Sequence, residues 1–196
     1  MLSAHNPSGG FRVVFLARQV AASPMNRAIR AALFLLVVLV AASAGYMLSA
    51  PGGTGDVDAR RVLAAALPDL AGEPRTIGDW KGEVLVVNFW ATWCPPCREE
   101  IPHFVRMQRE LGPRGLQFVG IAVDEKEKVR RFVGEHAVNY PILIGQLDAV
   151  ELSKMAGNDR GGLPYTLVFD RTGRVVSQHS GRLDEQKLRP LVEELL

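Results

Sequence analysis

The sequence predicts an α/β fold in which helices cover both faces of a mixed central sheet. Two observations predict it. An apolar run at residues 84–90 is followed by a helical pattern and then by a second apolar run at 116–123, the order of a strand–helix–strand unit. The chain then ends with a strand hairpin and a last helix that Asp184 begins. The first unit supplies parallel pairing and the hairpin supplies antiparallel pairing, so the sheet is mixed.

Length, composition and charge set limits on the class of protein. The chain has 196 residues, enough for one domain and a short extra segment. Its 47% hydrophobic and 22% charged residues are ordinary for a globular protein. The net charge of +2 divides unevenly, because residues 1–50 carry four arginines and no acid. The remainder is close to neutral, which excludes a basic surface for nucleic acid.

The N-terminal region resembles a targeting segment. Residues 1–24 show no convincing period and are interpreted as an extension. Met25 begins Met-Asn-Arg-Ala-Ile-Arg, which an uncharged stretch follows, as in a signal peptide or signal anchor. Because this pattern starts so naturally at Met25, we hypothesise that translation begins there and not at Met1. The mass of the native protein would distinguish the two starts.

The apolar segment after Arg30 is long enough to cross a membrane. Residues 31–50 would span about 30 Å as a helix. Arg27 and Arg30 favour a cytoplasmic N-terminus, so the rest of the chain would lie outside the cytoplasmic membrane. We expect residues 25–50 to be an uncleaved single-pass anchor. Cleavage after Ala44, at an Ala-x-Ala-like site, is the alternative.

A linker joins this anchor to the predicted domain. Residues 51–66 begin with a glycine-rich stretch, and the part from 56 to 66 is compatible with either a short helix or an extended segment. The domain is assigned to residues 67–196. It opens with a β-hairpin at 67–80, whose turn contains Ala-Gly.

The remaining elements follow from local patterns. Residues 84–90 read as a buried central strand, and the helix after it has an apolar face that includes Ile101, Phe104 and Leu111 and ends near Gly112. The later elements, in chain order, are a buried strand at 116–123, a charged helix at 124–133, a short strand at 140–144, a helix at 149–156, a strand from 165, a hairpin turn at 171–174, an edge strand at 175–179 and a helix from 184 to 196. The charges of the helix at 124–133 are expected to form a solvent-exposed face.

The chain has two cysteines, Cys94 and Cys97, with Pro95 and Pro96 between them. Proline is tolerated in the first turn of a helix, so Cys94 should lie at the helix N-terminus. Free backbone N–H groups and the positive end of the helix dipole favour its thiolate, which is the nucleophilic form. Cys97 lies one turn further on, where it can resolve a mixed disulfide.

Two structural roles for this cysteine pair fit less well. A structural zinc site needs four ligands, and the four histidines lack the paired spacing that would complete one, so no metal is expected. A purely structural disulfide would close a very short loop and remove little entropy from the unfolded chain. Redox chemistry is therefore the predicted function.

The segment Phe89-Trp-Ala-Thr-Trp-Cys-Pro-Pro-Cys-Arg98, with Pro102 five residues after the second cysteine, resembles the thioredoxin superfamily. With Asn88 before it, the motif is similar to the membrane-anchored bacterial reductases of the TlpA, ResA and CcmG group. The resemblance covers about residues 67–196 and implies a thioredoxin-like fold. The strand-and-helix block at 124–156 lies where this group has an insertion relative to plain thioredoxin.

The resemblance also implies a substrate-binding loop. Leu163 and Pro164 match the cis-proline loop that faces the cysteine pair, and the Leu163 backbone would pair with an extended substrate segment. A trans proline that merely opens a strand is the alternative. Trp93 and Pro95 would add an apolar contact surface, whereas Trp90 fits a core position at least as well.

Glu100 matches the acidic residue of the ResA-like reductases. Plain thioredoxin has a buried aspartate on the central strand, where this chain has Asn88, which cannot titrate. Glu100 is therefore the candidate to exchange a proton with Cys97, and water is the other carrier that remains open. The alternative is a surface glutamate that the helix dipole favours.

The function that follows is dithiol–disulfide exchange. Cys94 would attack a substrate disulfide, and Cys97 would release the reduced substrate and leave an oxidised Cys94–Cys97 pair. The resemblance implies oxidised periplasmic protein substrates, a DsbD- or CcdA-type electron donor, no cofactor, and clients in cytochrome c maturation or copper-site assembly. The pattern typical of CcmG is absent around Gly161, which disfavours a dedicated cytochrome c role. We expect a monomer.

Two rival functions use the same residues. A peroxiredoxin-like peroxidase would need a lone peroxidatic cysteine with threonine and arginine nearby, whereas Cys94 belongs to a dithiol motif. A copper-binding carrier would use Cys94 and Cys97 with a third ligand, and no well-placed histidine is evident in the sequence. Insulin reduction and copper titration separate the three functions.

Overall fold

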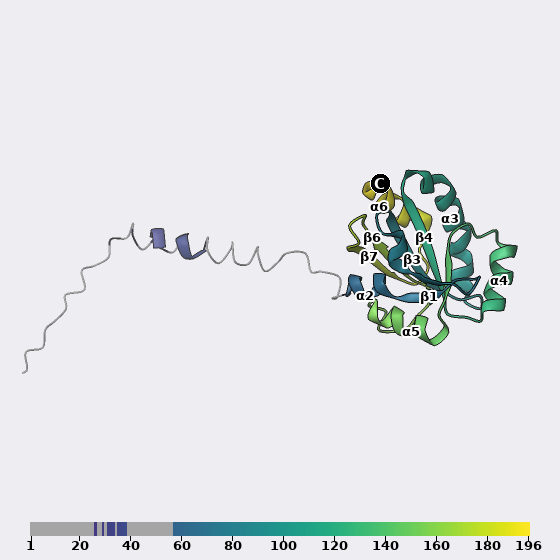
Figure 1. Cartoon of the computed structure of the whole chain (residues 1–196). Helices are drawn as coiled ribbons and strands as arrows, with labels where there is room; N and C mark the ends of the chain where they lie inside the picture. The colour runs from purple at the N-terminus through teal and green to yellow at the C-terminus, as the bar shows by residue number, and fades with distance from the viewer. Residues whose placement is uncertain (1–25, 27–28, 30, 34, 39–56) are drawn as a thin grey trace, which may run out of the picture. The chain divides into compact units, whose positions relative to one another are not determined.

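The computed structural model describes residues 26, 29, 31–33, 35–38 and 57–196 (Figure 1). The predicted extension and most of the predicted anchor and linker lie outside these residues, so their boundaries stay predictions. The described residues from 29 to 38 are helical. Within the described part of the chain, no helix combines the length and the apolar character needed to cross a bilayer.

Five strands form the central sheet of the domain, in the order β5-β4-β3-β6-β7. The three strands β3, β4 and β5 pair in parallel, whereas β6 pairs antiparallel with both β3 and β7. The predicted mixed sheet is therefore confirmed, with β7 at its edge. The strands are β3 (Val84–Trp90), β4 (Leu116–Ala122), β5 (Ile142–Ile144), β6 (Tyr165–Phe169) and β7 (Val175–Ser180).

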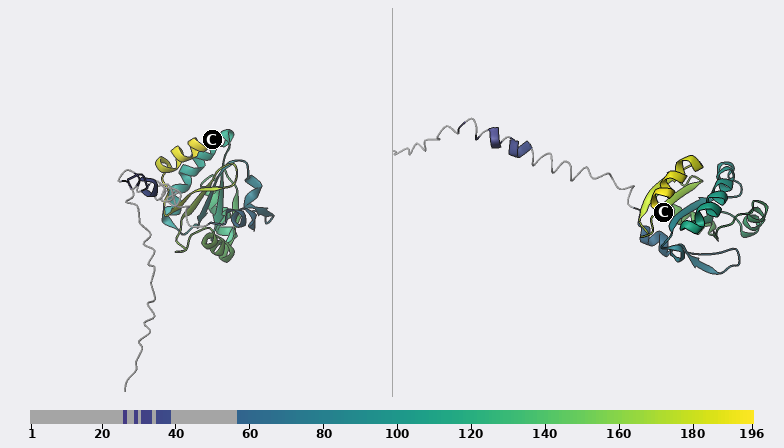
Figure 2. Two further views of the ribbon diagram at one scale, coloured as in Figure 1. Left: turned by 90° about the vertical axis from the view of Figure 1, so that its left-hand side faces the viewer. Right: turned by 90° about the horizontal axis from the view of Figure 1, so that it is seen from above.

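Helices cover both faces of this sheet, as the sequence predicts (Figure 2). One hydrophobic cluster joins the sheet to α3, α4 and α6, and the other joins it to α2 and α5. The helices are α2 (Ala59–Ala64), α3 (Pro95–Leu111), α4 (Lys126–Glu135), α5 (Gln146–Met155) and α6 (Glu185–Leu195).

The central strand β3 is buried along its whole length. Its side chains alternate between the two clusters, with Val86 and Trp90 on the α3 side and Val87 and Phe89 on the α5 side. A strand covered on both faces needs apolar residues at successive positions, which explains its continuous apolar run. Asn88 is the polar exception, and the alternation places it on the α3 side.

A small hairpin precedes the sheet, as predicted. Strands β1 (Ala66–Pro68) and β2 (Pro74–Thr76) are antiparallel, and Asp69 Oδ1 accepts hydrogen bonds from three backbone N–H groups in the turn between them. The hairpin is shorter than predicted, because residues 77–80 form a 3-10 helix. The ambiguous lead-in contains helix α2, whose first turn is capped by the side chain of Asp58.

Several predicted boundaries need correction. Helix α4 begins at Lys126 and not at 124, because Asp124 is buried and bonded to Thr92. Helix α5 begins three residues before the predicted start at 149, and β5 is shorter than 140–144. Asp184 is the N-cap residue of α6, yet its carboxylate makes no capping hydrogen bond and instead pairs with Arg182 at 2.9 Å.

Gly120 on β4 provides a test of core packing. A Cβ atom at this position would lie 2.6 Å from Ile142 Cδ1 and 2.9 Å from Trp90 Nε1. We therefore expect Gly120→Ala to lower the free energy of unfolding by about 1–3 kcal/mol, through overpacking. The measurement is urea denaturation followed by circular dichroism.

Gly134 in helix α4 is the matched control. A Cβ atom there meets nothing within 4 Å, so Gly134→Ala should raise the free energy of unfolding by about 0.5–1 kcal/mol. Equal effects of the two substitutions would contradict the packing that the structure gives Gly120.

Candidate active site

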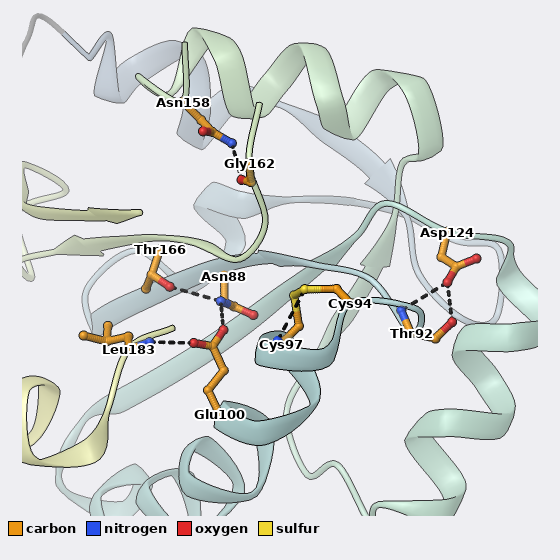
Figure 3. The surroundings of a disulfide bond; sticks show 10 residues. All are labelled: Asn88, Thr92, Cys94, Cys97, Glu100, Asp124, Asn158, Gly162, Thr166 and Leu183. Atoms are coloured by element: carbon orange, nitrogen blue, oxygen red, sulfur yellow. Dashed lines mark hydrogen bonds between the residues drawn. A yellow bond between two sulfur atoms is a disulfide. The ribbon is translucent and has the colours of Figure 1, made fainter. Parts of the chain in front are cut away.

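Cys94 is the N-cap residue of helix α3, as predicted (Figure 3). Pro95 and Pro96 fill the first helical positions and have no N–H group, so the first available donor is the backbone N–H of Cys97. That N–H donates to Cys94 Sγ over 3.4 Å. The helix N-terminus therefore directs both a hydrogen bond and its dipole at this sulfur, which favours the thiolate when the pair is reduced.

Cys94 and Cys97 form a disulfide in this structure. Cys97 is fully buried, and Cys94 is only 4% exposed. Cys94 is thus less exposed than a nucleophile at a helix mouth suggests, and it belongs to the hydrophobic cluster under α3. It nevertheless lines a surface pocket, whereas Cys97 does not. The two sulfurs are therefore inequivalent, with only Cys94 facing the pocket.

This pocket has a volume of about 490 Å³ and is mostly apolar. It contains three of the four residues that the sequence predicts for substrate binding, and Trp93 at its rim is 64% exposed. Trp90, by contrast, is a core residue. The lining residues are Trp93, Cys94, Pro95, Pro96, Val123, Val150, Ser153, Gly161 and Leu163.

The peptide bond between Leu163 and Pro164 is cis, which confirms the prediction from sequence. Pro164 is buried, and Leu163 reaches the pocket. The loop before it is held by Asn158, whose Nδ2 donates to the carbonyl of Gly162 over 2.9 Å. Asn158 was not predicted from the sequence, because nothing in its neighbourhood marks it as buried.

The turn that leads into Cys94 is also held by a residue that is far away in the sequence. Asp124 Oδ2 accepts hydrogen bonds from the backbone N–H of Thr92, over 3.1 Å, and from its hydroxyl. The sequence placed Asp124 in a solvated helix face, so this interpretation was wrong. The carboxylate follows β4, which pairs with β3, and sheet pairing brings it beside the active-site turn.

Glu100 is fully buried beneath the cysteine pair, so the alternative of a surface glutamate is wrong. Its Oε1 accepts a hydrogen bond from Asn88 Nδ2 over 2.8 Å, and its Oε2 accepts one from the backbone N–H of Leu183 over 2.8 Å. Burial raises the pKa of Glu100 to about 7, while the hydrogen bonds from Leu183 and Asn88 oppose the rise. Glu100 therefore changes charge near neutral pH.

Asn88 connects Glu100 to the sheet. Its Nδ2 also donates to Thr166 Oγ1 over 3.0 Å, so the amide group bridges α3 and β6 (Figure 3). Among the residues that the structure describes, no hydrogen bond joins Glu100 directly to either cysteine. Glu100 is thus linked to the central strand β3 by its hydrogen bond with Asn88.

The side chains around the pair show no built metal site. In the described part of the chain, no group of three or more histidine, cysteine or acidic residues is placed to hold a metal ion. The structure brings together the two sulfurs, the carboxyl group of Glu100 and the amide of Asn88.

A cysteine pair at the N-terminus of the helix after the central strand, with a cis-proline loop beside it, defines a thioredoxin-like dithiol–disulfide site. Residues 49–195 match the Redoxin family, and the chain belongs to this family. It is a redox enzyme of the thiol–disulfide oxidoreductase class, which agrees with the sequence-based prediction of activity.

Curated relatives support this class. The chain is 30% identical over 129 residues to the thiol-disulfide oxidoreductase ResA of Halalkalibacterium halodurans, which covers 65% of this chain and 70% of that protein. It is also 30% identical over 127 residues to ResA of Bacillus subtilis, and this match covers 62% of this chain and 66% of that protein.

Solved structures show the same fold. A thiol:disulfide interchange protein of the thioredoxin family from Chlorobium tepidum superposes with a TM-score of 0.60 and 30% identity, over 67% of this chain and 92% of that one. A secreted thiol-disulfide isomerase from Corynebacterium glutamicum, at 21% identity, shares the fold with a TM-score of 0.62. This match covers 67% of this chain and 83% of that one.

Proposed function

We propose that this protein is a reductase of protein disulfides on the outer side of the cytoplasmic membrane. The observation that carries the proposal is the inequivalence of the two sulfurs. Cys94 lines an open apolar pocket at the N-terminus of α3, and Cys97 is fully buried behind it. One sulfur is accessible to a substrate, and the other is shielded from it but lies beside the first.

The first step is attack by Cys94 on the substrate. In the reduced protein, the Cys94 thiolate attacks one sulfur of a substrate disulfide, forming a mixed disulfide and releasing the other substrate sulfur as a thiolate. The exposed ring of Trp93 and the Leu163 backbone hold the substrate segment against the pocket. The released thiolate takes a proton from solvent.

The second step regenerates the disulfide. Cys97 loses its proton, attacks Cys94 Sγ and displaces the second substrate thiolate, so that the substrate is reduced by two electrons and the pair is oxidised. Glu100 accepts the proton from Cys97. It suits this task because its pKa of about 7 lets it take up and release a proton near neutral pH.

The N-terminal segment sets the proposed location. The apolar residues 31–50, with Arg27 and Arg30 before them, favour a single-pass anchor that leaves the catalytic domain outside the cytoplasm. Electrons would then reach the oxidised pair from a DsbD- or CcdA-type membrane donor. The proposed clients are the cysteines of apocytochromes c or of copper-site assembly proteins, and the protein acts as a monomer.

Redox equilibration with glutathione tests the direction of the reaction. We expect the Cys94–Cys97 pair to be more reducing than glutathione, and the reduced protein to accelerate insulin reduction by dithiothreitol. A pair more oxidising than glutathione would overturn the assignment as a reductase. Faster consumption of hydrogen peroxide than of insulin would instead support a peroxidase, and stoichiometric copper binding without insulin reduction would support a carrier.

Cell fractionation tests the location. The full chain should sediment with membranes, and deletion of residues 25–50 should move it out of that fraction. A full chain found in the soluble cytoplasmic fraction would contradict the anchor.

A further inference from the structure

The side-chain oxygen of Asn88 is a buried hydrogen-bond acceptor without a partner. Asn88 is 2% exposed, and its Oδ1 accepts no hydrogen bond from any residue that the structure describes. Buried polar groups are nearly always paired, because an unpaired one costs about as much free energy as a lost hydrogen bond. An orphan acceptor at an active site therefore points to a donor that is present in another state.

The orientation of this amide is set by its other end. Nδ2 donates to Glu100 Oε1 and to Thr166 Oγ1. If the amide were turned over, Oδ1 would face the carboxylate oxygen of Glu100, and two acceptors would oppose each other. The observed orientation keeps the donor on Glu100 and leaves Oδ1 directed elsewhere.

That direction is toward the disulfide. Asn88 belongs to the face of β3 that packs on α3, together with Val86 and Trp90, and this is the cluster that contains Cys97. Cys97 and Glu100 are three residues apart on α3, so they share one face of the helix. Figure 3 shows the Asn88 oxygen on the side of its amide that faces the two sulfurs, away from Glu100 and Thr166.

Cys97 can donate a hydrogen bond only when the pair is reduced. In the disulfide, neither sulfur carries a proton, so neither can donate to Oδ1. Reduction gives Cys97 an S–H group inside the same buried cluster, where water does not compete for it. The buried oxygen would then gain the partner that it lacks in the oxidised form.

We propose that Asn88 Oδ1 accepts a hydrogen bond from the Cys97 thiol in the reduced protein, which makes Asn88 a positioning residue that favours the dithiol over the disulfide. The proposal deepens the proposed exchange reaction and rests on it for its consequence, but the hydrogen bond itself can be measured without any substrate. It keeps Cys97 protonated while Cys94 attacks, and it places the thiol next to the amide that holds Glu100.

The S–H stretching band of Cys97 tests the hydrogen bond directly. The chain has two cysteines, so Cys94→Ser leaves a single S–H group. We expect its infrared band at a lower frequency than that of an unbonded thiol. Adding Asn88→Leu should return the band to the unbonded position, whereas adding Thr166→Val, which leaves Oδ1 in place, should keep it lowered. A band that is the same in all three proteins would overturn the proposal.

The redox equilibrium tests the consequence. We expect Asn88→Leu to shift the equilibrium with glutathione toward the disulfide by about three- to tenfold, where tenfold corresponds to about 30 mV for two electrons. Thr166→Val is the matched control, because it removes the other partner of Nδ2 and leaves Oδ1 in place. Its equilibrium should stay within about twofold of the native value. An equal shift in both variants would indicate a merely structural role.

The two ideas fail separately. If the protein does not reduce insulin but the Cys97 band depends on Asn88, the proposed function is wrong and the hydrogen bond stands. If insulin is reduced and the band does not respond to Asn88→Leu, the function stands and the role of Asn88 is refuted.

Discussion

Replacing Cys94 by serine is expected to abolish insulin reduction, with a loss on the order of 10³-fold or more, because a hydroxyl stays protonated at neutral pH and is a poor nucleophile. The structure makes Cys94 the sulfur that faces the pocket and accepts the hydrogen bond from the Cys97 N–H. The measurement is the turbidity of insulin chains released in the presence of dithiothreitol.

Cys97→Ser is the matched variant, and a different result is expected from it. Cys94 would still attack a substrate disulfide, but no buried thiol would then resolve the mixed disulfide. The variant should therefore accumulate a covalent adduct with its substrate, visible as a mass increase that reduction removes. Adducts on Cys97 in the Cys94→Ser variant, and none on Cys94 in the Cys97→Ser variant, would mean that the two roles are reversed.

The sequence predicted those parts of the site that depend on local pattern. The strand Val84–Trp90 was predicted with its observed bounds, because a continuous apolar run is what a strand buried on both faces requires. The position of Cys94 followed from the two prolines, which are well tolerated in the first turn of a helix. The cis bond before Pro164 came from the family resemblance and not from local physics.

Other parts of the site depend on long-range contacts, which no local pattern reports. Glu100 meets the backbone of Leu183, which lies 83 positions away along the chain. Leu183 belongs to the segment between β7 and α6, and no local pattern in the sequence places that segment over Glu100. In the same way, the sequence does not distinguish Asp124 from the neighbouring charged residues. The pairing of β4 with β3 places it beside Thr92.

The pocket also contains residues that local sequence patterns do not predict. Val150 and Ser153 on α5 line it beside Cys94, yet α5 precedes the cis-proline loop and is far from the cysteine motif in sequence. The expected substrate residues came from two short motifs, and both reach the pocket. Helix α5 belongs to the segment between β4 and β6. Only the three-dimensional structure shows that this helix forms one wall of the pocket.

Glu100→Gln is the second substitution with a large expected effect. If Glu100 accepts the proton of Cys97, glutamine should slow the resolution of the mixed disulfide by about 10²-fold at pH 7, a typical contribution of general base catalysis. The native rate should rise with a midpoint near pH 7, where Glu100 ionises, and the variant should lack this step. Stopped-flow tryptophan fluorescence during oxidation of the reduced protein would measure both rates.

Glu99→Gln is the control for this experiment. Glu99 is the neighbouring residue on α3, but its side chain is exposed and pairs with Arg182 over 2.7 Å. Its removal should change the rate by less than about twofold, because a surface ion pair is worth little. A loss of the pH 7 step in this variant as well, or an unchanged profile from pH 5 to 9 in Glu100→Gln, would refute the proton transfer.

The same carboxyl group links stability to pH with a definite sign. Its pKa is about 7 in the folded protein and about 4.5 when unfolded, so the folded state binds more protons between these values. The free energy of unfolding therefore falls as pH rises from 4.5 to above 7, by about 3 kcal/mol from this group. Glu100→Gln should remove this slope and leave the protein close to its native stability at pH 5. A slope that persists in the variant would place the buried proton elsewhere.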